Sequence, residues 1–232
     1  MILLFTGVPG SGKSLHAAKM IRDHLKWRRC PVICNFDVNP DLKGYKAHFT
    51  YRPNERLTPD FLRDFAAQYW QKSQPREDEI LLVVDEAQLL FNTREWSRND
   101  RMDWVEFLSQ HRHFGYCVVF MTQIDRMLDR QIRALAEYEF QHRKISSFGF
   151  KGSIVKALCL GHEAFVCVQT YHGMGRLKLG QQFFIGTKSL YKVYDSYSAF
   201  RRIEDTPEDG ATGSPPEGVP DVRRLALQVV GA

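Results

Sequence analysis

Long apolar runs are missing from this sequence. None approaches the roughly 18 to 20 residues needed to span a membrane as a helix. The first residues are strand-like and uncharged, without the basic segment that opens a secretory signal. With 232 residues, of which 44% are hydrophobic and 25% charged, the composition is that of an ordinary soluble protein. We therefore expect a soluble chain with one large domain, or one domain and a tail.

Cysteines are few and lack a pairing pattern. The five cysteines stand at positions 30, 34, 117, 159 and 167, an odd number without a C-x₂-C pair or a histidine at zinc spacing. We interpret them as reduced thiols in a cytosolic environment, in or near the core. The histidines at 111, 113, 142 and 172 fit no known metal-site spacing either, so we predict no zinc centre.

Excess charge is also small. The formal net charge is +5; residues 201–232 carry four Arg against six Asp or Glu, or −2, which leaves +7 on residues 1–200. This mild basic bias is compatible with nucleic acid or an anionic membrane surface nearby. It is equally compatible with a solvated surface of mixed charge, so charge alone assigns no partner.

A glycine-rich phosphate loop is present near the start. Residues 7–14 read GVPGSGKS and fit the pattern G-x-x-x-x-G-K-[ST], in which backbone N–H groups cradle a nucleotide's phosphates. The apolar run Ile2–Phe5 precedes the loop as a buried strand, and helical spacing follows it. The nucleotide-binding residues that we predict are Gly7, Val8, Pro9, Gly10, Ser11, Gly12, Lys13, Ser14 and Leu15. Lys13, expected to face solvent in the nucleotide-free loop, reaches the β- and γ-phosphates, and Ser14 ligates Mg²⁺.

A pair of acids supplies the second half of this site. The run Ile80–Val84 ends at Asp85 and Glu86. We predict that Asp85 is the second Mg²⁺ ligand. Glu86 is placed to orient and deprotonate the attacking water, as a general base does. The sequence therefore predicts a Mg²⁺-dependent ATPase, in which ATP is hydrolysed.

Three further polar residues are candidates for the same site. Thr122 and Gln123 end a third apolar run, 117–121, and either could contact the γ-phosphate or the water. In this class of ATPase, that strand lies between the phosphate-loop strand and the strand before the acids. Arg112 precedes the run and could neutralise transition-state charge in a neighbouring subunit. A structural pairing of Arg112 with acids of its own chain is equally compatible with the sequence.

Strand and helix patterns alternate along the first half of the chain. Apolar runs at 2–5, 32–34, 80–84 and 117–121 predict buried strands, and the patterns at 58–72, 101–113 and 125–136 predict helices. Thr58 and Pro59 suit the start of the first of these helices, whose inner face we expect to include Leu62, Phe65, Ala66 and Tyr69. This alternation predicts an α/β fold, a three-layer sandwich with a mainly parallel sheet. Ligands bind at the carboxyl ends of such strands.

The pattern changes after about residue 137. Residues 164–171 and 178–185 are rich in strand formers and are joined by a Gly173-Met174-Gly175 turn, which predicts an antiparallel extension of the sheet. Between 206 and 221, seven of sixteen residues are Pro or Gly, as in a linker. We therefore predict a nucleotide-binding domain at 1–205 and a disordered tail or linker at 206–232.

Several segments together resemble one known family. They are FTGVPGSGKSLHA, LLVVDEAQ, HRHFGYCVVFMTQ and IRALAEYEFQHRK, with YDSY at 194–197. The two nucleotide motifs are generic, whereas the HRH-G and TQ block is more specific. These segments, spread over roughly residues 1–200, are similar to the zonular occludens toxin (Zot) family, which includes the filamentous-phage gene I assembly proteins.

The resemblance implies a function beyond nucleotide binding. It implies a P-loop NTPase domain on the cytoplasmic face of the host bacterium's inner membrane, which drives assembly and extrusion of filamentous virions. It also implies that the tail at 206–232 leads towards a membrane segment. Implied partners are further copies of the chain in a ring, single-stranded phage DNA or its nucleoprotein complex, coat and assembly proteins, and a secretin channel. No residue here supports the toxin activity associated with the family's periplasmic part.

Two alternatives remain open from the sequence. The DEAQ segment also resembles helicase boxes, so a ring-type DNA translocase or helicase is one alternative; a single phosphate loop disfavours a two-core helicase. The other is a scaffold that binds nucleotide without hydrolysing it and thereby controls assembly.

Overall fold

The computed structural model describes residues 1–91, 98–145, 162–172 and 177–193. The chain divides into two units, Met1–Ser196 and Tyr197–Ala232. The first unit contains the elements described below, whereas the second, and with it the predicted tail at 206–232, lies outside the described residues. The predicted turn at 173–175 also lies outside them. No helix in the described part of the chain is long and apolar enough to cross a membrane.

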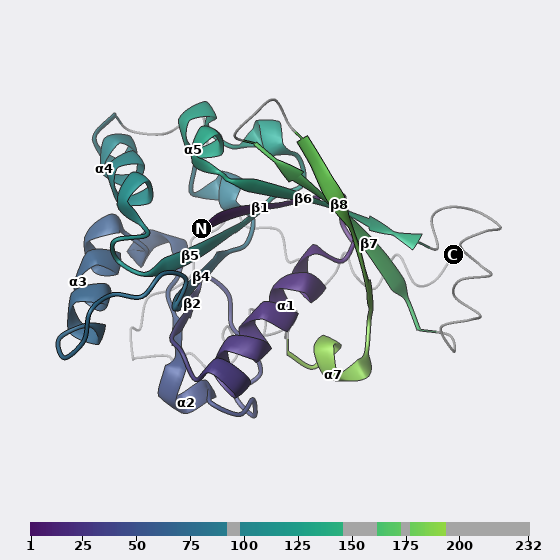
Figure 1. The fold of residues 1–232 in the computed structure, drawn as a ribbon, viewed down its shortest axis with the longest axis horizontal. Coiled ribbons are helices and arrows are strands. Elements are labelled where there is room, and N and C mark those ends of the chain that lie inside the picture. Colours follow the sequence, from purple (N-terminus) through teal and green to yellow (C-terminus); the bar gives the residue numbers. More distant parts are fainter. Residues whose placement is uncertain (92–97, 146–161, 173–176, 194–232) are drawn as a thin grey trace, which may run out of the picture. The chain divides into compact units, whose positions relative to one another are not determined.

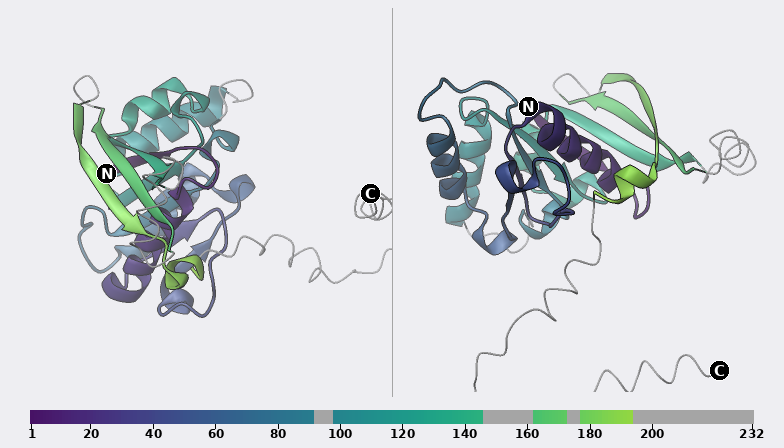
Figure 2. Two further views of the ribbon diagram at one scale, coloured as in Figure 1. Left: turned by 90° about the vertical axis from the view of Figure 1, so that its right-hand side faces the viewer. Right: turned by 90° about the horizontal axis from the view of Figure 1, so that it is seen from below.

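An eight-stranded sheet forms the centre of the first unit (Figure 1). Its strands in sequence order are β1 (Ile2–Thr6), β2 (Val32–Cys34), β3 (Phe49–Tyr51), β4 (Ile80–Val84), β5 (Tyr116–Met121), β6 (Tyr138–Lys144), β7 (Ala164–Tyr171) and β8 (Leu177–Ile185). The spatial order is β3-β2-β4-β5-β1-β6-β7-β8. The strands from β3 to β6 are parallel, and β7 and β8 are antiparallel, with β8 along the outer edge (Figure 2). The predicted mainly parallel sheet with an antiparallel extension is confirmed.

Helices cover both faces of the parallel part. They are α1 (Lys13–Asp23), which continues as a π-helical turn at His24–Arg28, α2 (Tyr45–His48), α3 (Pro59–Tyr69), α4 (Arg98–Gln110), α5 (Arg130–Leu135) and α7 (Lys188–Tyr191). Short 3₁₀ turns occur at Asn54–Arg56, Ala87–Leu89 and Asp125–Met127. Figure 1 shows α1 on one side of the sheet and α3 and α4 on the other. The predicted three-layer sandwich is confirmed.

Alternation along β1 explains the two cores. Ile2 and Leu4 belong to a buried cluster with residues of α3, α4 and α5, whereas Leu3 and Phe5 belong to a second cluster with residues of α1. Successive side chains of a strand point to opposite faces, so an uninterrupted apolar strand must be covered on both. Burial of both faces holds β1, and the loop that follows it, between two packed layers.

The predicted helix at 58–72 is confirmed as α3, with a cap that the sequence specifies. The Thr58 hydroxyl accepts a hydrogen bond from the N–H of Phe61 at 3.2 Å, and Pro59 occupies the first helical position, as such residues do at helix starts. The prediction of its inner face was wrong at one residue, because Tyr69 is exposed and Trp70 is buried instead. The Trp70 indole N–H donates to the Phe114 carbonyl at 3.0 Å, so a polar partner on the loop before β5 draws this ring inward.

Two further expectations need correction. The predicted helix at 125–136 is broken into a 3₁₀ turn and the short α5. Asp129 starts α5 anew, because its carboxylate accepts the N–H of Gln131 at 2.7 Å. Strand β6 was not predicted, because its residues alternate between buried and exposed and include several charges. Its position beside β1 nevertheless places its carboxyl end next to the phosphate loop.

Candidate nucleotide-binding site

The loop between β1 and α1 has the backbone geometry of a phosphate cradle. Gly7, Gly10 and Gly12 all have positive φ, at 141°, 73° and 98°, a region that favours glycine. A Cβ on Gly7 would lie 2.6 Å from the His142 carbonyl oxygen, and one on Gly12 would lie 2.6 Å from the Phe165 ring. The N–H of Gly7 donates to the Gln123 carbonyl at 3.2 Å. The loop is thus fixed between the ends of β5 and β6, and it leads directly into the start of α1, the kind of helix end at which anions bind.

Lys13 turns back onto the loop rather than facing solvent. Its Nζ donates to the Gly7 carbonyl at 2.5 Å and to the Val8 carbonyl at 3.3 Å, and the residue is only 8% exposed. The expectation of a solvent-facing lysine was therefore wrong. Burial lowers the pKa of the Lys13 ammonium, and the negative charges of Asp85 and Glu86 act in the opposite direction. Lys13 thus lies within the electrostatic reach of the predicted acid pair.

The chemistry of this loop fits a polyphosphate. Ser11 is 1% exposed, and its hydroxyl has no hydrogen-bond partner among the described residues, although a buried hydroxyl ordinarily has one. The Lys13 ammonium is held by two carbonyl oxygens that phosphate oxygens could replace. An unsatisfied hydroxyl and a cation in a glycine-rich loop are features that a bound triphosphate would use.

The side chain of Asn35, which follows β2, holds the backbone of Asp85 at the end of the neighbouring strand β4. The Asn35 side chain donates to the Asp85 carbonyl at 2.8 Å and accepts the Asp85 N–H at 2.7 Å. Its amide nitrogen also lies 2.8 Å from Asn54 Oδ1. These contacts clamp the backbone at the end of β4, where the metal-ligating carboxylate is predicted. The sequence contained a signal for Asn35, since it directly follows the run 32–34, but we assigned it no role.

Glu86 is held in a strained backbone conformation. Its φ is 46°, in the left-handed region that few non-glycine residues adopt and that is common at functional sites. Its N–H donates to the Asp85 carboxylate at 2.8 Å, and its own carboxylate accepts a short hydrogen bond from the Gln88 amide. Gln88 of the DEAQ segment thus orients the predicted general base, a role that the sequence analysis did not assign.

The two residues after β5 differ in their surroundings. Thr122 is fully buried; its N–H donates to the Phe5 carbonyl at 3.0 Å and its hydroxyl to the Ile124 carbonyl at 3.2 Å. Gln123 instead lines a cavity of about 650 Å³ beside the phosphate loop. As expected, β5 lies between β1 and β4. The structure therefore brings Gln123, and not the Thr122 side chain, to the loop; a direct role for either with nucleotide stays a prediction.

Arg112 lies away from the site of its own chain. It stands between α4 and the start of β5, so it belongs to the amino-terminal edge of the parallel strands. Its guanidinium contacts the Glu137 carboxylate at 2.6 Å, and this partner raises the Arg112 pKa. The intrachain pairing left open by the sequence is thus present. A role in a neighbouring subunit's site stays a prediction, and it would require this ion pair to open.

Strand β6 contributes residues that the sequence analysis missed. Gln141, His142, Arg143 and Lys144 line the 650 Å³ cavity together with Gly7–Ser11. A second cavity of about 370 Å³ opens on the α1 side of the loop, lined by Gly10–Leu15, Lys144, Phe165, Leu190 and Tyr191. Arg143 and Lys144 stand in the HRK segment that ends β6, and only the pairing of β6 with β1 reveals their position.

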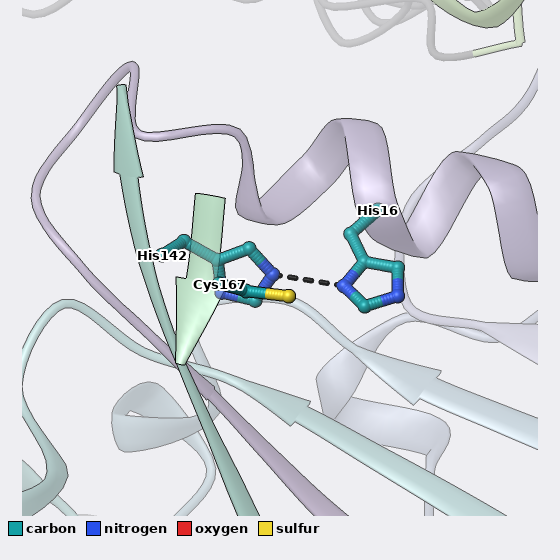
Figure 3. Close-up of side chains that lie close together, drawn as sticks. All are labelled: His16, His142 and Cys167. Carbon is teal, nitrogen blue, oxygen red and sulfur yellow. Dashed lines mark hydrogen bonds between the residues drawn. The ribbon is translucent and has the colours of Figure 1, made fainter. Parts of the chain in front are cut away.

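Two histidines and a cysteine converge beneath the loop (Figure 3). His16 of α1, His142 of β6 and Cys167 of β7 place their ligand atoms within 4.8 Å of one another. His16 Nδ1 lies 2.9 Å from His142 Nε2. Burial lowers the pKa of His16 to about 4 and that of His142 to about 3, so both rings are neutral at physiological pH. Four of the five cysteines are described, and all four are buried and free.

Comparison with known proteins agrees with the fold and the motifs. The family model described as zonular occludens toxin (Zot) matches residues 1–200. The chain belongs to the Zot family. Its phosphate loop, acid pair and residues 111–123 all fall within the matched part.

Curated relatives of the chain are gene 1 proteins of filamentous phages. The chain is 27% identical over 216 residues to the gene 1 protein of Enterobacteria phage M13, a match that covers 88% of this chain and 62% of the relative. It is 26% identical over 209 residues to the gene 1 protein of Escherichia phage If1, covering 86% and 59%. The chain thus spans about three fifths of the length of these relatives.

Comparison with solved structures gives two neighbours of limited similarity. The N-terminal domain of zonular occludens toxin from Neisseria meningitidis is 22% identical, with a TM-score of 0.49, over 84% of this chain and 98% of that one. The DNA-packaging ATPase B204 of Sulfolobus turreted icosahedral virus is 18% identical, with a TM-score of 0.49, over 80% and 96%.

Proposed function

We propose that this Zot-family chain binds and hydrolyses ATP with Mg²⁺, as the motor domain for assembly and export of filamentous phage virions across the bacterial inner membrane. The observation that carries the proposal is the strand arrangement: β1 and β4 both run parallel to β5, so the phosphate loop after β1 and the acids Asp85 and Glu86 after β4 lie at the same edge of the sheet. A cation and two carboxylates at the same edge of a parallel sheet are the parts that phosphoanhydride hydrolysis requires.

Each part of the site has a role in this reaction. Lys13 leaves the loop carbonyls and binds the β- and γ-phosphate oxygens, while the N–H groups of the loop bind the remaining oxygens. Ser14 and Asp85 would hold Mg²⁺. When bound, that ion would neutralise negative charge on the β- and γ-phosphates. Glu86, oriented by Gln88, accepts the proton of the attacking water.

The smaller cavity supports a place for the nucleoside. It begins at the loop residues that would bind phosphate and continues onto Phe165, Leu190 and Tyr191. Tyr191 is 50% exposed, so its ring is available to a planar base. The nucleoside would therefore lie against β7 and α7, on the side of the loop away from the acid pair.

The relatives support the wider role. The curated matches are phage gene 1 proteins, and the Zot family model covers the whole catalytic part of the chain. We propose that the domain acts at the cytoplasmic face of the host inner membrane as a homo-oligomeric ring. Its partners would be single-stranded phage DNA or its nucleoprotein complex, coat and assembly proteins and, through the full-length protein, a secretin.

Phosphate release from ATP tests the catalytic proposal. The Glu86→Gln variant should bind ATP with unchanged affinity in calorimetry but lose hydrolysis by about 10²- to 10⁴-fold, the usual contribution of a general base. Glu55→Gln, at an exposed position of the Asn54–Arg56 turn, is the matched control and should hydrolyse like the wild type. If wild type and Glu86→Gln both bind ATP and neither hydrolyses it, the scaffold function is favoured instead.

Nucleic acid in the same assay addresses the translocase alternative. A ring translocase that acts on DNA alone should hydrolyse ATP faster when bare single-stranded DNA is added. An assembly motor should respond to the nucleoprotein complex and coat protein. Stimulation by bare DNA equal to that by the nucleoprotein complex would favour the translocase.

A further inference from the structure

We propose that His16, His142 and Cys167 form a binding site for a thiophilic divalent transition metal, with Zn²⁺ as the fitting ion, separate from the predicted Mg²⁺ site. The three side chains come from three elements, α1, β6 and β7, and meet on the α1 side of the sheet. Among the described residues, they are the group of His, Cys, Asp or Glu side chains close enough to share one ion. Two imidazoles and a thiolate are ligands that Zn²⁺ prefers, whereas Mg²⁺ prefers oxygen.

The distances between the ligand atoms suit a metal after small movements. Zn–N bonds of about 2.0–2.1 Å and Zn–S bonds of about 2.3 Å in a tetrahedral site place two nitrogens about 3.3 Å apart, and nitrogen and sulfur about 3.6 Å apart. The two imidazole nitrogens now lie 2.9 Å apart, and all three ligand atoms lie within 4.8 Å. The nitrogens must therefore separate by about 0.4 Å, and the sulfur must approach by at most about 1.2 Å, movements within reach of small side-chain rotations.

The hydrogen bonds of His16 and His142 also orient these two side chains for metal binding. His142 Nδ1 lies 3.3 Å from the Thr6 carbonyl, so this nitrogen carries the proton and Nε2 presents a lone pair. Such a bond from the second ring nitrogen to a carbonyl is the usual support of a metal-bound histidine. His16 Nδ1 then donates to His142 Nε2, and metal binding would replace that bond after the His16 proton moves to its Nε2. The Cys167 thiol would release its proton to solvent on binding.

Strand pairing places the sulfur beside one of the histidines. Cys167 of β7 is the direct antiparallel partner of His142 of β6. Directly opposite residues of paired strands hold their side chains side by side on one face of the sheet. In Figure 3 the sulfur points toward the histidine pair. Cys117, buried in the same hydrophobic cluster, lies in no such group of ligands.

Access and surroundings suit a bound ion. The aromatic rings of Phe5, Phe140 and Phe184 lie within 4.6–5.7 Å of the His16 ring, between ring centres. This apolar enclosure limits water around the site. His16 is partly exposed, whereas His142 and Cys167 are buried, so the ion can enter from the His16 side and one water can fill the fourth position.

The site would join the phosphate-loop helix to the C-terminal strands. His16 lies three residues after Lys13 on α1, and Cys167 lies on β7, which pairs with β6. A bound ion would therefore fix α1 against β6 and β7 and raise the thermal stability of the domain, because an ion that binds only the folded state stabilises it. This inference is independent of ATP hydrolysis, since the proposed Zn²⁺ site and the predicted Mg²⁺ site share no ligand.

Cobalt spectroscopy and zinc content test the site on the whole chain. The chain is purified with chelator and reducing agent, and Co²⁺ is then titrated into the metal-free protein. Wild type should develop a sulfur-to-cobalt absorption band and tetrahedral d–d bands at one equivalent, and Zn²⁺ should abolish both. Cys167→Ser should remove the sulfur band, and His142→Gln should weaken Zn²⁺ affinity at least tenfold. Melting curves should show a Zn²⁺-dependent rise in Tm for the wild type that Cys167→Ser lacks.

Matched cysteine variants decide between this site and others. Cys117→Ser replaces a buried cysteine of the same cluster, and Cys159→Ser replaces one outside the described residues; both should keep the band and the Tm rise. Binding of less than one equivalent of Co²⁺ by the folded wild type would overturn the proposal, leaving the two histidines as a hydrogen-bonded core pair. A sulfur band that survives Cys167→Ser, or disappears with Cys159→Ser, would also overturn it.

Discussion

Replacing Asn35 with alanine tests whether the neighbouring strand holds the acid pair in place. The Asn35 side chain makes two hydrogen bonds to the backbone of Asp85, at 2.7 and 2.8 Å. Because Asn35 is partly exposed, water can replace some of this bonding, and we take about 1 kcal/mol for each bond. The expected loss in the free energy of unfolding is therefore about 2 kcal/mol. For a domain of about 190 residues this corresponds to a Tm lower by about 4–8 °C.

The effect on catalysis should exceed the effect on binding. Without the clamp, the end of β4 can move, and with it the carboxylates of Asp85 and Glu86. Displacement of catalytic groups by about 1 Å can cost about a hundredfold in rate. The phosphate loop does not contact Asn35 through any hydrogen bond described here, so ATP affinity without Mg²⁺ should change less than threefold.

The assay combines melting curves, calorimetric ATP binding and steady-state phosphate release. Asn39→Ala is the matched control, since the Asn39 side chain accepts the N–H of Asp41 at 2.9 Å in an exposed turn four residues after Asn35. That variant should hydrolyse ATP like the wild type. If Asn35→Ala melts and hydrolyses like Asn39→Ala, the clamp has no functional role and our reasoning about the end of β4 is wrong.

Four further outcomes are expected. Lys13→Ala should abolish ATP binding or hydrolysis while the domain stays folded, although loss of its contacts to the loop carbonyls should alter the melting curve; unchanged ATP affinity would remove the phosphate-loop assignment. Hydrolysis should require Mg²⁺, and Ser14→Ala or Asp85→Ala should weaken activity or its metal dependence, so full activity in excess chelator would contradict the shared ion. The isolated chain should be monomeric or weakly associating. If Arg112 acts in a neighbour's site, an assembly that mixes Arg112→Ala and Lys13→Ala chains should regain some hydrolysis. No recovery of hydrolysis at any mixing ratio would assign Arg112 to a role within its own chain. Burial lowers the pKa of His111, so the unfolded chain binds more protons than the folded chain below pH 6.5. The contribution of His111 to the free energy of unfolding should therefore be fully present above that pH and decrease as the pH falls. A Tm equal at pH 7.5 and 5.5 would contradict this.

Much of the local structure around the predicted nucleotide site could be predicted from the sequence, because its residues are adjacent in the chain. The loop at 7–14 specifies its own shape through glycines with positive φ, and its strand and helix are recognisable from apolar spacing. The acid pair follows an uninterrupted buried strand. The start of α3 could also be predicted from nearby residues, since Thr58 caps the helix through a residue only three positions away. Local backbone geometry and hydrogen bonding are sufficient at each of these places.

The remaining features depended on strand order and could not be predicted in this way. Pairing of β6 with β1 brings Arg143 to the loop, and pairing of β2 with β4 brings Asn35 to Asp85. The direction of β5 places Arg112 at the edge opposite the loop, where it meets Glu137. His16 and His142, whose rings touch at 2.9 Å, are 126 residues apart. A short sequence pattern encodes the partners within one turn or strand, whereas contacts between distant strands arise only when the whole sheet buries both of its apolar faces.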